Sequence, residues 1–299
     1  MSRNNLTYWA ASKYWQLTNR TDKNRHQFYA GAKGLRIVTF HGTRPAEFAD
    51  FQTIAQWCID NFDIATPEDA DALFAGEAYN ADHDKLLITF DDGWQSNYQA
   101  AKWLAERGIK AIFFIVPSLI NRTVAEFEAY HKANGITPYF TIKPDQPNDH
   151  ENGLTRKQLD SMMQMGHRIA AHNYAHRNLG QLHDHDELVY EIDRSIDAVS
   201  QITGQPCLDF AVAFGQPHNL SMEACEYLRQ KNLRTYMCFR GLNVPDQTCR
   251  FMLRHGFEYS HPKSFTRQAI HGGVDHTVRA QHMDMIRRAG TLSLASQTP

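Results

Sequence analysis

The run at 86–90, Leu-Leu-Ile-Thr-Phe, constrains the fold more than any other part of this sequence, and it continues directly into Asp-Asp-Gly at 91–93. A nearly continuous apolar strand is typical of parallel sheets that helices cover on both faces. Apolar residues at helical spacing follow at 94–106, and a second apolar run follows at 111–116. This succession of strand, helix and strand predicts a βαβ unit, and hence a parallel α/β sheet with helices outside.

The alternation continues along the chain. Further strands are predicted at 35–40, 168–171 and 210–214. A capping box predicts a helix that begins after Thr155, and an apolar stripe predicts another that ends near Gly204. The chain has 299 residues and a mass of 34.3 kDa, which suits one α/β barrel domain with extensions.

The chain is predicted to divide into three segments. The main domain is expected at 35–260, and terminal extensions are expected at 1–34 and 261–299. Within the domain, the stretch 121–153 scatters Asn, Gly and Pro through polar and aromatic sequence. Such turn residues interrupt regular structure, so this stretch is predicted to be an insertion over one rim of the sheet.

Composition excludes some classes of partner. The formal net charge is -2 and there is no long basic run, so a nucleic-acid partner is not expected. No apolar stretch is long enough for a signal sequence or a membrane span, which predicts a cytoplasmic protein. The aromatic and basic residues near the start leave peripheral membrane contact open, and the oligomeric state is not determined by these patterns.

Chemically reactive side chains follow three of the predicted strands. His41 follows one, the pair Asp91 and Asp92 follows another, and His172 and His176 follow a third. In parallel α/β folds the carboxyl ends of the strands meet at one edge of the sheet, where ligands and catalytic groups collect. These residues are therefore expected to converge on one site.

The residue types in this group favour a metal. Two adjacent buried carboxylates repel each other unless a cation or hydrogen bonds compensate. His172 and His176 are four residues apart, a spacing at which two imidazoles can bind one ion. Two imidazoles and one carboxylate leave coordination positions for water and substrate, so a hydrolytic divalent metal is predicted. Zn²⁺ fits best, with Co²⁺, Fe²⁺, Ni²⁺ or Mn²⁺ as alternatives. No organic cofactor is implied.

Taken together, these motifs resemble a known family. Thr-Phe-Asp-Asp-Gly at 89–93 resembles the first motif of the polysaccharide deacetylases, also called the NodB-homology group or carbohydrate esterase family 4, and 172–176 resembles their HxxxH motif. The stretch 211–215 looks like a degraded third motif, and Asn173 stands where Ser or Thr is usual. The resemblance spans about 35–255 and implies a distorted (β/α) barrel of the NodB-homology type.

The resemblance also implies roles for single residues. Asp91 corresponds to the general base of the family. Asp92, His172 and His176 correspond to the metal ligands. The backbone amide of Phe214 corresponds to the donor that stabilises the oxyanion, although its side chain replaces a more usual Tyr.

Two roles have competing candidates. Leu253-Arg254-His255 matches a late segment that carries the general acid in many members. Some members are permuted, however, and the strand before His41 then corresponds to that segment. We prefer His41 as the acid because its strand is the clearer one, and we keep His255 as the alternative. For the arginine that orients the base, Arg254 is preferred to Arg240.

The expected activity is removal of an N-acetyl or other N-acyl group from a sugar, in a polysaccharide, an oligosaccharide or a lipid-linked precursor. Without a secretion signal, a surface-polysaccharide precursor modified on the cytoplasmic side is favoured. Two alternatives remain, because the fold fixes the bond that is broken but not its carrier. The chain could hydrolyse a cyclic or formyl amide, or it could be a non-catalytic saccharide-binding protein.

Overall fold

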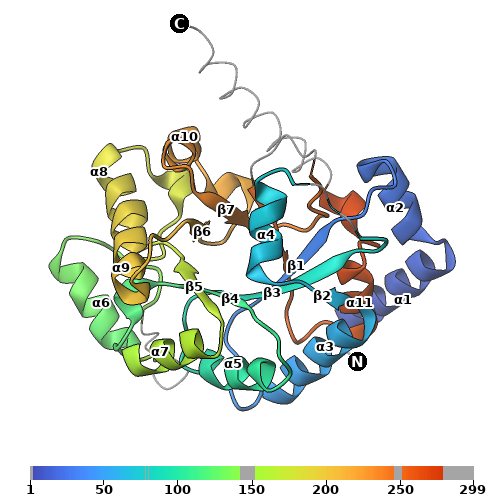
Figure 1. The fold of residues 1–299 in the computed structure, drawn as a ribbon, viewed down its shortest axis with the longest axis horizontal. Coiled ribbons are helices and arrows are strands. Elements are labelled where there is room, and N and C mark those ends of the chain that lie inside the picture. Colours follow the sequence, from blue (N-terminus) through green and yellow to red (C-terminus); the bar gives the residue numbers. More distant parts are fainter. Residues whose placement is uncertain (1–2, 78, 80, 142–151, 246–250, 279–299) are drawn as a thin grey trace, which may run out of the picture. The chain divides into compact units, whose positions relative to one another are not determined.

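The computed structural model describes residues 3–77, 79, 81–141, 152–245 and 251–278 (Figure 1). The chain divides into two compact units. Unit 1 comprises residues 1–39, 46–88 and 238–299, and unit 2 comprises residues 40–45 and 89–237. Among the residues described, no helix is both long and apolar enough to cross a membrane.

Unit 2 is built on parallel strands, and β3 enters it from unit 1. Its strands are β3 (Lys85–Phe90), β4 (Ile112–Ile115), β5 (Arg168–Ala171), β6 (Asp209–Ala211) and β7 (Arg234–Met237). Each pairs with the next in parallel register, as in Phe90 with Phe113 and Ile115 with Ala171. The strands predicted at 86–90, 111–116 and 168–171 are confirmed. Their carboxyl ends share one edge of the sheet.

Helices lie outside these strands (Figure 1). They are α5 (Asn97–Ala105), α6 (Val124–Ala133), α7 (Arg156–Gln164), α8 (His185–Leu188), α9 (Arg194–Thr203) and α10 (Met222–Gln230), and a π-helix, η3 (Val189–Asp193), joins α8 to α9. The capping box that begins α7 at Thr155 is confirmed. The predicted end of α9 is also confirmed, because Gly204 closes it with a φ of 72°.

Three local predictions differ from the structure. The stretch 121–153, predicted to be irregular, contains α6, which a second capping box begins at Thr123; residues 142–151 lie outside the described part. The helix predicted from Trp94 begins at Asn97. The strand predicted at 210–214 ends at Ala211.

Unit 1 contains the remaining α-helices and strands of the described residues. They are α1 (Arg3–Leu17), α2 (Arg20–Tyr29), β1 (Leu35–Phe40), α3 (Phe48–Asn61), β2 (Asp63–Ile64), α4 (Pro67–Phe74), β8 (Phe251–Leu253), β9 (His255–Gly256) and α11 (Lys263–Ile270). None of these helices was predicted. Strand β1 was predicted, and its residue Val38 pairs in parallel with His255. Helix α1 packs on α11, with the ring of Tyr8 centred 4.6 Å from that of Phe265.

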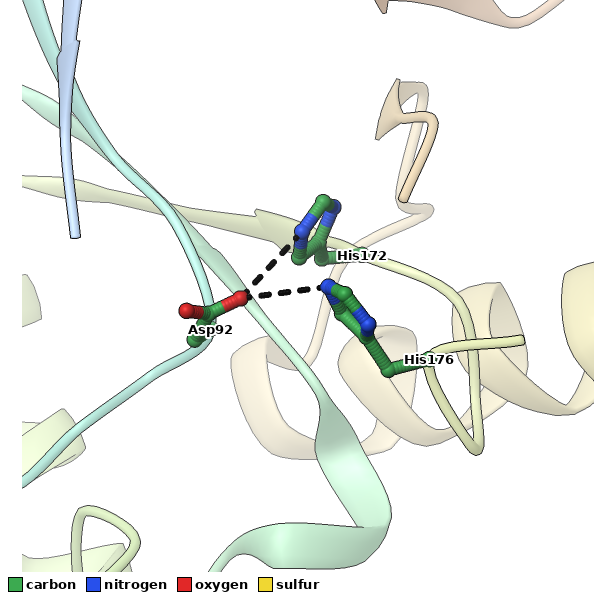
Figure 2. A group of neighbouring side chains, drawn as sticks. All are labelled: Asp92, His172 and His176. Carbon is green, nitrogen blue, oxygen red and sulfur yellow. Dashed lines mark ion pairs between the residues drawn. The ribbon is translucent and has the colours of Figure 1, made fainter. Parts of the chain in front are cut away.

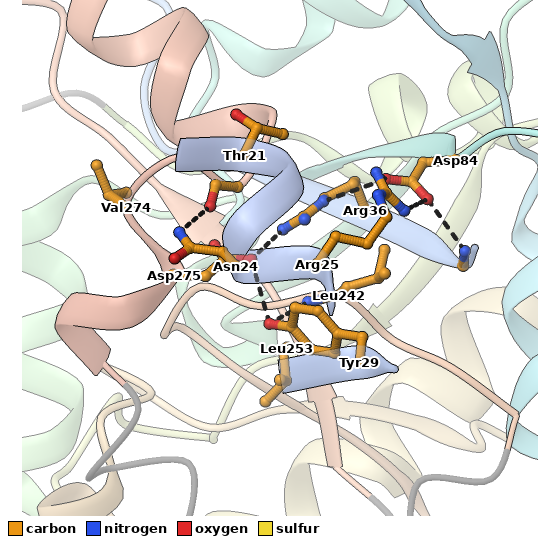
Figure 3. Close-up of polar contacts among 12 residues, drawn as sticks. Thr21, Asn24, Arg25, Tyr29, Arg36, Asp84, Leu242, Leu253, Val274 and Asp275 are labelled. Carbon is orange, nitrogen blue, oxygen red and sulfur yellow. Dashed lines mark hydrogen bonds and ion pairs between the residues drawn. The ribbon is translucent and has the colours of Figure 1, made fainter. Parts of the chain in front are cut away.

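A buried polar network ties α2 to the strands of unit 1 (Figure 3). Arg25 on α2 binds Asp84 through two nitrogen–oxygen contacts of 2.8 and 2.6 Å. Arg36 on β1 binds Asp275 at 2.8 Å, and the hydroxyl of Tyr29 donates to the same carboxylate. Because buried charges are costly without partners, this pairing anchors the N-terminal helices to the unit.

Candidate active site

Asp91 and Asp92 follow β3 directly, and both are buried. The amide of Asp91 donates to the carbonyl of Phe40, which joins the ends of β1 and β3. Asp92 has a φ of 75° and Gly93 a φ of 80°, so the chain turns sharply here. A Cβ at Gly93 would lie 3.0 Å from that of Ile115, which explains why glycine follows the two aspartates.

Asp92, His172 and His176 converge in unit 2 (Figure 2). Oδ1 of Asp92 lies 3.5 Å from Nε2 of His172 and 3.3 Å from Nε2 of His176. The three candidate ligand atoms lie within 4.8 Å of one another and all three side chains are buried. Within the described residues, Oδ1 of Asp92 has no well-aligned hydrogen bond. The group therefore fits a cation that all three residues could bind.

The pKa shifts of Asp92 and His176 also favour a bound cation between them. Burial by itself would raise the pKa of Asp92, but the adjacent His172 and His176 hold it well below its usual value. The pKa of His176 is lowered, chiefly by burial, although Asp92 opposes this shift. Asp92 thus stays ionised, and the imidazole of His176 is biased toward the neutral form that binds metals.

Neighbouring groups orient these side chains. Nδ1 of His172 donates to the carbonyl of Ala211 at 2.9 Å, which turns Nε2 toward Asp92. The indole N–H of Trp94 donates to Oδ2 of Asp92 at 2.8 Å. The prediction that Trp94 lies on the apolar face of a helix is wrong, because α5 begins only at Asn97. Phe140 packs against His176, with ring centres 4.6 Å apart.

Backbone strain collects at this site. Of the eight non-glycine residues with positive φ in the described part of the chain, four lie here: Asp92, Asn173, His176 and Phe214, with φ of 75°, 54°, 54° and 63°. Such conformations are disfavoured for side chains with a Cβ and persist where the surroundings enforce them.

Asn173 bridges two loops of the site. Its amide nitrogen donates to the carbonyl of Arg177 at 2.8 Å, and its Oδ1 accepts from the amide of Ala213 at 3.3 Å. Asparagine tolerates positive φ better than most residues. The side chain at this position, although not in the candidate ligand set, therefore shapes the HxxxH loop.

His41 lies in unit 2, in the loop that follows β1. Its carbonyl accepts from the side-chain amide of Asn97 at 2.7 Å, and Thr43 is bound to Ser96. The imidazole is exposed, and its charge contributes to the lowered pKa values of Asp92 and His176. The loop thus places an accessible imidazole within electrostatic range of the candidate metal ligands.

The competing candidates lie in unit 1. His255 on β9 is buried, and burial together with the charges of Arg240 and Arg36 lowers its pKa well below the usual value. Arg254 is fully buried, and its Nη1 donates to the hydroxyl of Thr39 at 3.3 Å. Burial lowers the pKa of Arg240.

A cleft of about 610 Å³ opens beside the candidate ligands in unit 2. Residues along it include Tyr139, His176, Arg177, Glu187 and Phe214. Within the described residues, the amide N–H of Phe214 donates to no acceptor. A donor without a partner beside a cleft could bind an oxygen of a ligand.

A hydrogen-bonded chain runs behind the HxxxH loop. The hydroxyl of Ser118 donates to the carbonyl of Tyr174. Nε2 of His131 lies 2.9 Å from the Ser118 oxygen, and its Nδ1 lies 3.0 Å from the hydroxyl of Tyr190. Because the Ser118 proton is used, Nε2–H donates to Ser118 and Nδ1 accepts from Tyr190. Burial, with the charge of Arg122, lowers the pKa of His131 to about 4, which fits this neutral form.

This neutral histidine predicts a pH dependence of folding. Between pH 6.5 and 4 the unfolded chain binds a proton at His131 that the folded chain does not, so the stability present above pH 6.5 is lost as the pH falls. The limit is about 3 kcal/mol, from 1.36 kcal/mol per pKa unit. Urea unfolding of chelator-treated wild type and His131→Gln is expected to show the gap between them shrinking toward pH 4. An equal gap at pH 7 and 4.5 would contradict this.

The fold and this site together define a carbohydrate N-deacetylase as the class of protein. The family model described as "Polysaccharide deacetylase" matches residues 78–236, which is more than half of the chain, and the chain therefore belongs to the polysaccharide deacetylase family. No curated protein matches its sequence.

Solved structures show the same fold. The chain is similar to IcaB from Ammonifex degensii, with a TM-score of 0.61 and 18% identity over 80% of this chain and 96% of that one. The chain is also similar to the deacetylase PplD of Streptococcus pyogenes in complex with acetate, with a TM-score of 0.58 and 18% identity over 79% of this chain and 98% of that one. A de-N-acetylase from Aggregatibacter actinomycetemcomitans has a TM-score of 0.57 and 14% identity over 78% of this chain and 98% of that one. The predicted NodB-type (β/α) barrel, with parallel strands and outer helices, is confirmed.

Proposed function

We propose that this protein is a metal-dependent hydrolase that removes an N-acetyl or other N-acyl group from a sugar. One observation carries the proposal: Asp92, His172 and His176 meet within 4.8 Å, next in sequence to a second buried carboxylate, Asp91. Membership of the polysaccharide deacetylase family supports the same reaction.

Asp92, His172 and His176 would hold the metal. Two imidazoles and one carboxylate suit Zn²⁺, and also Co²⁺, Fe²⁺, Ni²⁺ or Mn²⁺. The ion bound there would polarise the acyl carbonyl and make a water molecule more acidic. The buried surroundings strengthen these electrostatic effects, because water screens them less.

The chain's own residues complete the reaction. Asp91 accepts a proton from the attacking water as the oxygen bonds to the acyl carbon. The amide of Phe214 donates to the oxyanion that forms. His41 then donates a proton to the nitrogen as the carbon–nitrogen bond breaks, which releases a carboxylate and a free sugar amine.

Two of these assignments have rivals. His41 is supported as the acid because its exposed imidazole can reach a substrate and its charge acts on the candidate ligands. His255 is buried and its pKa is well below the usual value, so it would hold no proton to donate near neutral pH. Arg254 stays the proposed partner that orients Asp91, with Arg240 second.

The substrate proposed is an N-acylated sugar in a polysaccharide, an oligosaccharide or a lipid-linked precursor of a surface polysaccharide. The cleft beside His176 supports a saccharide, because it combines the aromatic rings of Tyr139 and Phe214 with charged and amide side chains. Sugars present both apolar faces and many hydroxyls, so mixed surfaces of this kind suit them.

The test is acetate release by the full chain, freed of metal with a chelator and then given Zn²⁺, Co²⁺ or Mn²⁺. N-acetylglucosamine oligomers are the first substrates, and cyclic ureides and formyl amides are tested in parallel. Metal-dependent acetate release from the oligomers is expected. Hydrolysis of the ureides or formyl amides alone would assign a non-sugar amide instead.

A third outcome would favour a binding protein. A chain that binds the oligomers but releases no acetate with any metal would overturn the enzymatic proposal. The altered third motif, with Ala213 and Phe214, motivates this alternative. Oligomer binding should then be the same in wild type and Asp91→Asn.

A further inference from the structure

Glu191 holds the HxxxH loop by its backbone. Its side chain is fully buried, and one oxygen, Oε2, accepts from three amide groups of the loop. These are the N–H groups of Tyr174, Ala175 and Arg177, at 3.2, 3.1 and 3.4 Å. Successive amides that converge on one anion form a nest, which fixes the conformation of the chain around it.

This nest fits the unusual shape of the loop. Asn173 and His176, which flank the first two of these amides, both have a φ of 54°. That conformation turns neighbouring N–H groups toward the same side of the chain. Without an acceptor at this position, three backbone donors, of which that of Ala175 is buried, would lose their partner, so the loop would be expected to relax into a different shape.

Ser118 holds the same loop at a carbonyl. Its hydroxyl donates to the carbonyl oxygen of Tyr174 and is itself held by His131, which Tyr190 holds in turn. Tyr190 and Glu191 are consecutive residues of the π-helix η3. The π-helix η3 thus holds three amide N–H groups of the loop directly through Glu191. It also holds the carbonyl of Tyr174 indirectly, through Tyr190, His131 and Ser118. Extra-residue bulges of this kind are frequent at functional sites.

We propose that Glu191 and Ser118, which we call the loop clamp, are positioning residues that set metal affinity by holding His172 and His176 in register with Asp92. This inference rests on the metal centre of the proposed function. Neither residue is a ligand, and neither takes part in the chemical step. The clamp acts before the metal arrives, by removing loop conformations in which the imidazoles point apart.

The test measures metal affinity directly. Zn²⁺ is titrated into metal-free wild type, Glu191→Gln and Ser118→Ala against a competing chelating dye. The pH is 8, because burial raises the pKa of Glu191 to about 7. Loss of a group that orients metal ligands typically weakens binding about 10- to 100-fold, and we expect this for Glu191→Gln and a smaller loss for Ser118→Ala. If Glu191→Gln does not fold, Ser118→Ala carries the test.

Asp193→Asn is the matched control. Asp193 lies on the same π-helix and carries the same charge, but its Oδ2 binds Tyr227 and Lys231 rather than the loop. Its Zn²⁺ affinity should equal that of wild type. A second readout separates positioning from chemistry: activity of the Glu191→Gln variant should recover at high Zn²⁺, whereas that of Asp91→Asn should not.

The outcomes separate the two proposals. If wild type binds Zn²⁺ and both clamp variants bind it equally well, the clamp is overturned and the proposed function stands. If Asp193→Asn weakens binding as much as Glu191→Gln, a general effect of charge replaces the clamp. A wild type that takes up no metal would overturn the proposed function, and the inference with it.

Discussion

Replacing Asp91 with asparagine is expected to lower kcat for acetate release by about 10²- to 10⁴-fold, the usual contribution of a general base. The amide has nearly the same shape as the carboxylate but cannot accept the proton of the attacking water. Metal content should stay at the wild-type level, because Asp92, His172 and His176 form the candidate ligand group without Asp91. Turnover and bound metal are measured on the same samples.

Asp160→Asn provides the control for this variant. Asp160 is half-buried on α7 and pairs with Arg156, so its replacement should change neither turnover nor metal content. Near-normal turnover of Asp91→Asn would rule Asp91 out as the base. Loss of metal from the variant would instead make Asp91 part of the metal site.

Replacing His172 with alanine is expected to remove both metal and activity. The variant lacks one of the three candidate protein ligands and leaves Ala211 without the imidazole that donates to its carbonyl. Two remaining ligands bind a divalent ion much more weakly, because each nitrogen or oxygen ligand contributes to the total affinity. Metal analysis after dialysis and acetate release at several Zn²⁺ concentrations check this.

His183→Ala is the matched substitution outside the site. His183 is exposed and lies 3.3 Å from Glu223. It should keep its metal and its activity. A His172→Ala protein that retained stoichiometric metal would remove this residue from the ligand set, whatever its activity.

Much of the fold could be predicted from local patterns. The apolar runs at 35–40, 86–90 and 168–171 became β1, β3 and β5, because a segment apolar on both faces is stable only where both are covered. The capping box at Thr155 correctly predicted the start of α7. It provides hydrogen-bond acceptors for the first amide N–H groups of the helix, which have no partner within the helix.

The missed helices lack such a signal. Asn121 and Gly135 are turn residues that lie just outside the two ends of α6. Because they flank the helix closely, the whole stretch was predicted to be irregular. Helix α11 carries few apolar residues, and they are stabilised by α1, more than 240 residues away in sequence. Tertiary packing there outweighs weak local preference.

The sequence by itself determined which residues meet at the site. Parallel strands deliver their carboxyl ends to one edge, so residue type and position after a strand were sufficient to group Asp92, His172 and His176, which the structure brings within 4.8 Å of one another. The sequence favoured His41 over His255 as the general acid only because the strand before His41 is the clearer one. The structure distinguishes these two by exposure, which depends on how loops and strands pack.

Only the tertiary structure decided how the candidate ligands are held. The indole bond from Trp94 to Asp92 arises because Trp94 pairs with Gly153 in an isolated antiparallel bridge before α5, instead of lying in a helix. Glu191 lies fifteen residues after His176, on another element, and reads in sequence as an ordinary polar position of a helix. Its three bonds to the loop exist because packing buries that carboxylate against strained backbone. Contacts of this kind depend on distances in space, which residue order and periodicity do not encode.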